Sequence, residues 1–243
     1  MARYTGRPTS VVDSFGPGPI TPAVKAIILA NIGFFVVSLF FRPIVRYLGL
    51  VPEDVLTRAW LWQPVTYMFL HADPMHILFN MLGVWMFGVE LERRWGTKLF
   101  ARYYAITGIG AGITVIVASF LPITALQQTY EAVTIGASGA LFGLLMAFAI
   151  YYPDRPILMF LLFPVPAKYF VMILGAINLL IMPGSGVSNS AHLGGLLFGY
   201  IYLKGRYNGG ITAEIKYRYL KWKMNRLRRK FDVYSGGRSD RIH

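Results

Sequence analysis

Residues 24–41 read VKAIILANIGFFVVSLFF, and this apolar stretch decides the class of protein. A membrane-spanning helix needs about 20 predominantly apolar residues, so the stretch predicts a helix that crosses a bilayer. No small-residue cleavage site follows it, and we interpret it as a retained span rather than a signal peptide. Further apolar runs follow at about Pro74–Val89, Leu99–Leu121, Val133–Tyr152, Lys168–Met182 and Ser188–Leu203. The sequence therefore predicts an all-α, polytopic membrane bundle of six transmembrane helices.

The composition agrees with a membrane protein. Charged residues make up only 14% of the chain and hydrophobic residues 55%, with a mean hydropathy of +0.50, whereas a soluble domain carries about 25% charged residues. The absence of cysteine excludes disulfides, thiolate catalysis and cysteine-ligated zinc. Four histidines and few acids inside the apolar runs supply a metal site poorly. We therefore predict no metal and no other cofactor.

The net charge of +13 is concentrated at one end of the chain. The stretch from Lys204 to His243 holds 12 Lys/Arg and 3 Asp/Glu, and so contributes +9. This pattern indicates a basic tail that flanks a membrane, and we predict no nucleic-acid partner. Residues 211–231 alternate apolar and basic side chains. They are expected to form either a basic amphipathic helix on anionic lipids or a solvated tail that only enforces topology.

Charge bias also predicts the topology. If both termini are cytoplasmic, only Arg42, Arg46 and Arg58 of the 24 basic residues lie on the outer side, as the positive-inside rule requires. We therefore expect a multi-pass protein of the cell membrane. Residues 1–22 are expected to be a flexible cytoplasmic tail, 23–204 the six-helix membrane domain, and 205–243 the basic cytoplasmic tail. An apolar connection broken by prolines, Ile157–Pro166, should lead into the fifth helix.

A few strongly polar residues interrupt the apolar runs, where each costs several kcal/mol unless it finds partners. They are His76, Asn80, Ser138, Asn178 and His192. In the predicted topology the second, fourth and sixth helices all begin on the outer side. His76 and Asn80 then lie near the start of the second helix, and Ser138 and His192 lie about one turn into the fourth and sixth. Three helices thus present polar groups at a similar depth.

These residue types suit acyl-transfer chemistry, although each also has a purely structural interpretation. His76 and Asn80 share one helix face and could either stabilise an oxyanion or bond across helices. Ser138 stands in Gly-Ala-Ser-Gly, which by itself indicates close helix packing. His71, in the preceding loop, is either a solvated or headgroup histidine or part of the site.

His192 lies on the same face as Gly195 and Gly199, a Gly-x-x-x-Gly pattern that permits close approach of another helix. If the partner is the Gly139/Gly143 face of the fourth helix, His192 meets Ser138, and a base lies beside a nucleophile. No Asp or Glu lies in a predicted span at this depth. A serine hydrolase here would therefore use a Ser–His dyad, with the histidine oriented by packing and hydrogen bonds.

Taken together, the motifs resemble the rhomboid family of intramembrane serine proteases over about residues 24–204. The matching patterns are His71-x-x-x-x-His76-x-x-x-Asn80, Gly136-Ala137-Ser138-Gly139 and Ala191-His192-x-x-Gly195-x-x-x-Gly199. The resemblance implies that Ser138 is the nucleophile and His192 the general base and acid. It implies an oxyanion hole of His76, Asn80 and the Ser138 N–H, with His71, Gly136 and Phe142 in support.

The resemblance further implies cleavage of single-pass transmembrane substrates near the outer face. Residues 60–71 would belong to a membrane-embedded first loop, 182–189 to a mobile outer cap, and 92–94 to a structural polar cluster on the inner side. Two departures stand out: Trp62-Gln63 replaces the common Trp-Arg of the first loop, and Phe142 replaces a tyrosine found in some members.

Two other functions compete with a protease. A non-proteolytic rhomboid-like protein would bind client helices, but it has no need for an intact Ser138/His192 pair. A small transporter or channel would show internal repeats and charges along a pathway, and the sequence shows neither.

Overall fold

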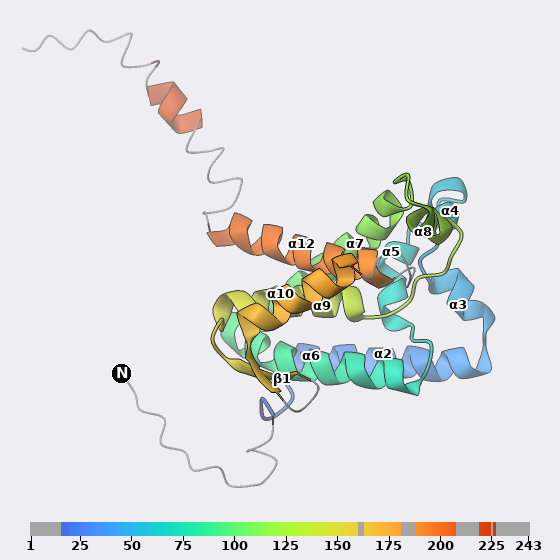
Figure 1. Cartoon of the computed structure of the whole chain (residues 1–243), viewed down its shortest axis with the longest axis horizontal. Helices are drawn as coiled ribbons and strands as arrows, with labels where there is room; N and C mark the ends of the chain where they lie inside the picture. Colours follow the sequence, from blue (N-terminus) through green and yellow to red (C-terminus); the bar gives the residue numbers. More distant parts are fainter. Residues whose placement is uncertain (1–15, 160–162, 181–187, 208–218, 225, 227–243) are drawn as a thin grey trace, which may run out of the picture. The chain divides into compact units, whose positions relative to one another are not determined.

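Helices make up most of this computed structural model, which describes residues 16–159, 163–180, 188–207, 219–224 and 226. Its long helices, drawn in Figure 1, are α2 (Pro22–Phe40), α6 (Pro74–Trp95), α7 (Thr97–Ala118), α9 (Ser138–Tyr151), α10 (Ala167–Leu180) and α12 (Ser188–Tyr207). In this described part, α2, α6 and α7 are long and apolar enough to cross a membrane, while α9 and α10 are apolar but shorter. A mainly helical membrane protein is therefore confirmed, and the count of six spans stays a prediction.

Helix α9 lies at the centre of the bundle, packed against α6, α7 and α10. Small residues permit this close packing. A Cβ atom added to Gly143 of α9 would lie 2.4 Å from Cβ of Thr107 on α7, and one added to Gly83 of α6 would lie 2.8 Å from Leu141 of α9. The glycines of the apolar runs thus place helices at distances that larger side chains would prevent.

The helix ends differ from the predicted ones in two places that matter for the site. Helix α6 continues to Trp95 instead of ending near Val89, because the carboxylate of Glu92 is satisfied inside the protein. It accepts hydrogen bonds from the N–H groups of Ala23 and Val24 and from the hydroxyls of Thr21 and Thr97. This carboxylate therefore joins the starts of α2 and α7 to the end of α6.

Helix α9 begins at Ser138, not at Val133. The residues before it run as extended chain, and Thr134 pairs with Leu50 of the first loop. Ser138 consequently stands at the very start of the helix rather than one turn into it.

A two-stranded hairpin precedes α10. Strands β1 (Pro156–Met159) and β2 (Phe163–Pro166) pair antiparallel, with Ile157 opposite Val165. The sequence predicted a connection here but no strands, so the all-α class omits this small element. Four-residue strands with three prolines leave no alternating pattern long enough to read.

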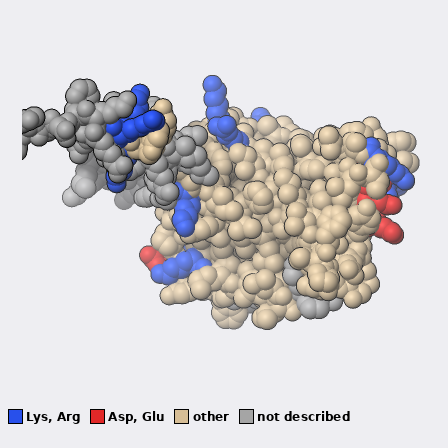
Figure 2. Space-filling model, turned by 90° about the horizontal axis from the view of Figure 1, so that it is seen from above, with Lys and Arg blue, Asp and Glu red and all other residues tan. Residues whose placement is uncertain are grey.

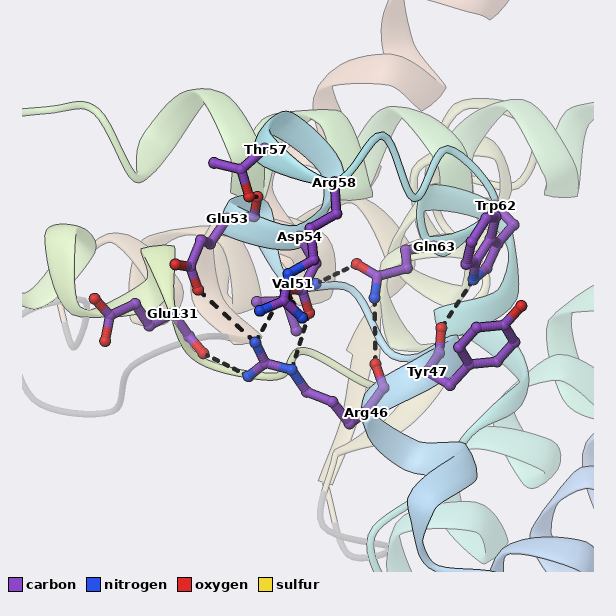
Figure 3. Close-up of polar contacts among 10 residues, drawn as sticks. All are labelled: Arg46, Tyr47, Val51, Glu53, Asp54, Thr57, Arg58, Trp62, Gln63 and Glu131. Carbon is purple, nitrogen blue, oxygen red and sulfur yellow. Dashed lines mark hydrogen bonds and ion pairs between the residues drawn. The ribbon is translucent and has the colours of Figure 1, made fainter.

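The loop between α2 and α6 is built from short helices: α3 (Pro43–Leu48), α4 (Pro52–Thr57), α5 (Gln63–Thr66) and the 3₁₀ turn η1 (Tyr67–Phe69). Figure 3 shows the contacts that hold it together. Asp54 is fully buried, and its carboxylate forms ion pairs with Arg46 at 2.9 Å and with Arg58 at 3.4 Å. Gln63, also buried, accepts from the N–H of Val51 and donates to the carbonyl of Arg46.

Two more short elements, α8 (Thr124–Gln127) and η2 (Gln128–Tyr130), follow α7 and pack near α4. The carbonyl of Glu131 accepts from Arg46, which links this segment to the first loop. The aromatic rings of Tyr47, Trp60 and Trp62 form a contiguous cluster. Such rings favour the membrane–water interface, and the interfacial position of this loop stays a prediction.

The surface carries few charges over most of its extent. Figure 2 shows one face on which the central area is uncharged and the coloured side chains lie toward the margins. Large apolar side chains are exposed, among them Phe40 at 87%, Leu180 at 79% and Met172 at 66%. An exposed apolar surface of this extent is unsuited to water and suited to lipid.

The chain divides into two compact units, 1–201 and 202–243. In the second unit, residues 219–224 are helical and expose Tyr219 and Trp222. Three predicted segments lie mostly outside the described residues: the amphipathic stretch 211–231, the cap segment 182–189 and the tail 1–22. The last residues of that tail contact α6, because Arg93 donates to the carbonyls of Pro17 and Pro19.

Candidate active site

Ser138 follows a turn that only glycine accommodates. Gly136 has a φ of +128°, a conformation that L side chains rarely adopt. A Cβ atom there would also lie 2.9 Å from Nε2 of His76. The N–H of Gly136 donates to the carbonyl of Tyr67 at 3.0 Å, which fixes the turn to the first loop. Ser138 is thereby presented at a helix N-terminus, where N–H groups lack intrahelical acceptors and the helix dipole favours negative charge.

The hydroxyl of Ser138 meets the imidazole of His192. Their Oγ and Nε2 atoms lie 2.8 Å apart, within hydrogen-bond distance. The two residues are 54 positions apart in sequence, and both are only partly buried. This is the base-beside-nucleophile arrangement that acyl transfer requires.

Glycines on both helices bring these side chains together. A Cβ atom on Gly195 of α12 would lie 2.0 Å from the carbonyl oxygen of Gly139 on α9. One turn further, a Cβ on Gly199 would lie 3.3 Å from Cα of Gly143. The predicted contact between the two glycine faces is therefore present in the structure.

Two further groups hold the His192 ring. Phe142, one turn after Ser138, stacks on it with ring centroids 4.1 Å apart and planes at 3°. On the other edge, Nδ1 of His192 lies 2.8 Å from Oδ1 of Asn178 on α10. Both ring nitrogens thus have partners, and one face of the ring is covered.

His76 lies against the serine turn from α6. Its Nδ1 accepts from the N–H of Ala72 at 3.3 Å. A neutral imidazole that accepts at Nδ1 carries its proton on Nε2, and Nε2 is the atom that faces Gly136. His76 is therefore arranged as a hydrogen-bond donor beside the serine turn. Asp73 fixes the start of α6 by accepting from the N–H groups of Met75 and His76 at 2.9 Å.

Asn80 and His71 complete the group around His76. Asn80 is buried and donates to the carbonyl of His76 at 2.9 Å. His71 is only 3% exposed, with its ring edge-on to that of His76 at a centroid distance of 4.9 Å. Burial, and to a smaller extent the neighbouring His76, lower the pKa of His71 to about 4. At 3% exposure His71 is not a solvated histidine, and its part in the site stays a prediction.

All the predicted site residues thus form one connected group: Ser138, His192, His76, Asn80, His71, Gly136 and Phe142. Sequence reasoning gave no place at the site to Asn178, although it noted a polar residue inside an apolar run. It also missed Tyr67, whose hydroxyl donates to the carbonyl of Gly108 at 2.7 Å while its own carbonyl holds Gly136. Nothing in the sequence marks Tyr67, because both contacts depend on tertiary packing. Within the described residues, no group of three or more His, Cys, Asp or Glu could hold a metal ion.

Comparison with known proteins identifies the family. A family model described as the Rhomboid domain matches residues 58–207, more than half of the chain. The chain belongs to the rhomboid family. The resemblance inferred from the three motifs is therefore confirmed.

Curated rhomboid relatives come from plants, bacteria and animals. RHOMBOID-like protein 6, mitochondrial, of Arabidopsis thaliana is 35% identical over 57% of this chain and 41% of its own length. Rhomboid protease AarA of Providencia stuartii is 30% identical over 59% of this chain and 55% of its own. Rhomboid-related protein 4 of Mus musculus is 30% identical over 81% of this chain and 61% of its own.

These matches cover only part of each relative, since the chain spans about half the length of the curated relatives it matches. A relative with protease in its name, together with the apolar helices, supports a membrane-embedded hydrolase at the level of the family.

Proposed function

We propose that this rhomboid cleaves transmembrane segments of membrane proteins as a serine endopeptidase, with Ser138 as nucleophile and His192 as general base and acid. The observation that carries the proposal is the 2.8 Å contact between Oγ of Ser138 and Nε2 of His192. The protease named among the relatives supports the same reaction class.

In the first half of the reaction, Nε2 of His192 takes the proton of the Ser138 hydroxyl as Oγ attacks the carbonyl carbon of the scissile peptide. The tetrahedral intermediate then carries a negative oxygen. As it collapses, the imidazolium returns its proton to the leaving amine, and an acyl-enzyme remains.

Three donors are available for that oxygen. The N–H of Ser138 is unpaired within the helix because Ser138 is the first residue of α9. Nε2–H of His76 faces the serine turn, and Asn80 retains one amide proton beyond the bond that it gives to His76. Losing one such donor costs roughly 10²–10³-fold in kcat in serine hydrolases.

In the second half, water attacks the acyl-enzyme, with His192 again as base. Water must therefore enter a protein whose outer surface is mostly apolar. Ser138, His76 and His192 are each partly exposed, whereas Asn80 is buried. This partial exposure provides the route for water.

The proposal includes a topology. With six spans and both termini cytoplasmic, the catalytic residues lie near the outer face, and substrates are single-pass proteins with a helix-destabilised site at that depth. The domain limits 23–204 and the flanking tails 1–22 and 205–243 follow from it, with anionic lipids as partners of the basic tail. The cell membrane stays a prediction, because some relatives are named mitochondrial.

The test uses the full chain in proteoliposomes with a fluorescent single-pass substrate that carries glycines near one end of its apolar segment. Cleavage is measured for wild type, Ser138→Ala and a matched control, Ser38→Ala. Ser38 is 3% exposed and its hydroxyl donates to the carbonyl of Phe35. Cleavage should vanish in Ser138→Ala and persist in Ser38→Ala.

A serine-reactive fluorophosphonate provides a readout that does not depend on the choice of substrate. Mass spectrometry should find the label on Ser138 in wild type and no label in His192→Ala. Cleavage by Ser138→Ala, or a label on a different residue, contradicts the proposal. Substrate binding without either cleavage or labelling identifies the client-binding alternative.

A further inference from the structure

Asn178 lies on α10, 7% exposed, with both ends of its amide engaged. Its Nδ2 donates to the carbonyl of Leu174, four residues earlier, at 2.8 Å. Its Oδ1 lies 2.8 Å from Nδ1 of His192. A polar side chain at this position thus reaches the general base of the proposed reaction from a third helix.

The contact with Leu174 determines which way the amide points. With the amide reversed, Oδ1 would face the Leu174 carbonyl, and two acceptors would lie 2.8 Å apart. The oxygen therefore faces His192. Since an amide oxygen can only accept, Nδ1 of His192 carries the ring proton, and Nε2 of the neutral ring is left as an acceptor. That is the tautomer able to take the proton of Ser138.

Two other asparagines make the same hydrogen bond within their helices as Asn178 does, and so serve as a comparison for its contact with His192. Asn31 on α2 and Asn80 on α6 also donate Nδ2 to the carbonyl four residues earlier. Among the described residues, the Oδ1 atoms of both are buried without a hydrogen-bond partner. The bond within the helix is thus common to all three, whereas Asn178 adds an acceptor to a catalytic histidine.

We propose that Asn178 is a positioning residue that fixes the tautomer and orientation of His192, so that the site operates as a Ser–His–Asn arrangement. The inference rests on the proposed function. In a Ser–His–Asp triad the third group performs the same task with a carboxylate, and the wrong histidine tautomer lowers kcat by roughly 10⁴-fold. Here an uncharged amide does so, together with the stacked ring of Phe142.

The experiment compares two substitutions of the same residue. Asn178→Leu removes both the acceptor and the donor, whereas Asn178→Asp keeps an acceptor for Nδ1 and replaces the donor to Leu174 by a second acceptor. Asn31→Leu, which breaks the equivalent bond in α2, is the matched control. Cleavage of the fluorescent substrate is followed from pH 5 to 9, and thermal unfolding is measured for every variant.

Asn178→Leu should lower kcat roughly 10- to 100-fold, on the scale of a buried ring nitrogen left without its partner, with little change in KM. Asn178→Asp should restore kcat to within about tenfold of wild type above neutral pH. Its carboxylate favours the imidazolium, so the acid limb of its pH profile should move to higher pH. Asn31→Leu should cleave like wild type.

Equal impairment in Asn178→Asp and Asn178→Leu would overturn the inference, because only the bond within the helix would then matter. The inference would also be overturned if the acid limb of the Asn178→Asp pH profile stayed at the wild-type pH. This measurement tests the inference even if Asn178→Leu does not fold. Wild-type kcat in Asn178→Leu with no cleavage by Ser138→Ala overturns only the positioning role. Cleavage by Ser138→Ala overturns the proposed function itself.

Discussion

Replacing Gly195 by alanine tests whether helix spacing sets the proposed catalytic contact between Ser138 and His192. The added Cβ would lie 2.0 Å from the carbonyl oxygen of Gly139, and real Cβ atoms essentially never lie under 3.0 Å from such an atom. The obstacle is backbone, so no side-chain rotation relieves it. Helices α9 and α12 must therefore separate by about 1 Å at this point.

His192 lies on the same helix, about one turn before Gly195, and moves with it. An added separation of about 1 Å takes the contact with Ser138 from 2.8 Å to about 3.8 Å, beyond a hydrogen bond. Because a 1 Å misplacement costs about 100-fold in rate, kcat should fall by about that factor. Overpacking should also cost about 1–3 kcal/mol of stability, partly offset by the higher helix propensity of alanine.

Gly205→Ala, on the same helix, is the control, since a Cβ there would meet no atom of the described residues within 4 Å. Cleavage rate, fluorophosphonate labelling and thermal unfolding are measured for both variants, with cleavage assayed well below the unfolding temperature. Wild-type kcat in Gly195→Ala, or an equal loss in Gly205→Ala, would refute the link between helix spacing and catalysis.

Three further predictions concern stability. The pKa of His71 is lowered to about 4 in the folded protein, so protonation of this residue favours the unfolded chain. The contribution of neutral His71 to the free energy of unfolding is complete above pH 6.5 and is lost as the pH falls toward 4. The loss amounts to up to about 3 kcal/mol. The free energy of unfolding, measured by denaturation at pH 4.5 and 7.5, should differ less between the two pH values in His71→Gln than in wild type. An equal difference would refute the lowered pKa of His71. Asp54→Asn removes the buried partner of two arginines and should lower the free energy of unfolding, measured by denaturation, by about 3 kcal/mol. Glu53→Gln, at a more exposed ion pair, should lower it by less than about 1 kcal/mol. Similar losses in the two variants would contradict this prediction. Glu92→Gln weakens four hydrogen bonds and should therefore lower the unfolding temperature. The control is Glu90→Gln, which removes an ion pair with Arg155 at a glutamate that is 22% exposed and should lower the unfolding temperature less. The reverse order would count against the role of Glu92.

The sequence predicted the parts of the fold that local chemistry determines. Apolar runs marked the long helices, and the glycine patterns around Ser138 and His192 indicated which faces meet. The start of α9 was placed too early, because the run from Val133 is apolar although its first residues pair with the loop at Leu50. Apolarity alone does not separate an extended buried segment from a helix.

Contacts between distant segments could not be predicted in the same way. Asp54 resembles a surface acid in the sequence, yet it is fully buried between two arginines. Asn178 was visible as a polar residue in an apolar run, but its partner depends on how α10 packs beside α12. Polar residues of a membrane protein can be recognised from sequence because their burial is costly, whereas their pairing is a property of the assembled bundle.

The site of Ser138, His192 and Asn178 contains no formal charge, and this bears on how the protein is made. An ionised side chain at the middle of a helix raises the free energy of entering a bilayer by about 2.5–3.5 kcal/mol. In the proposed topology, asparagine spares α10, a helix of only 14 residues, that penalty during biosynthesis. In that topology each helix could insert before its partners arrive, and the hydrogen bonds proposed to orient His192 would form only when the bundle assembles. The neutral third residue therefore reconciles a polar site with stepwise membrane insertion.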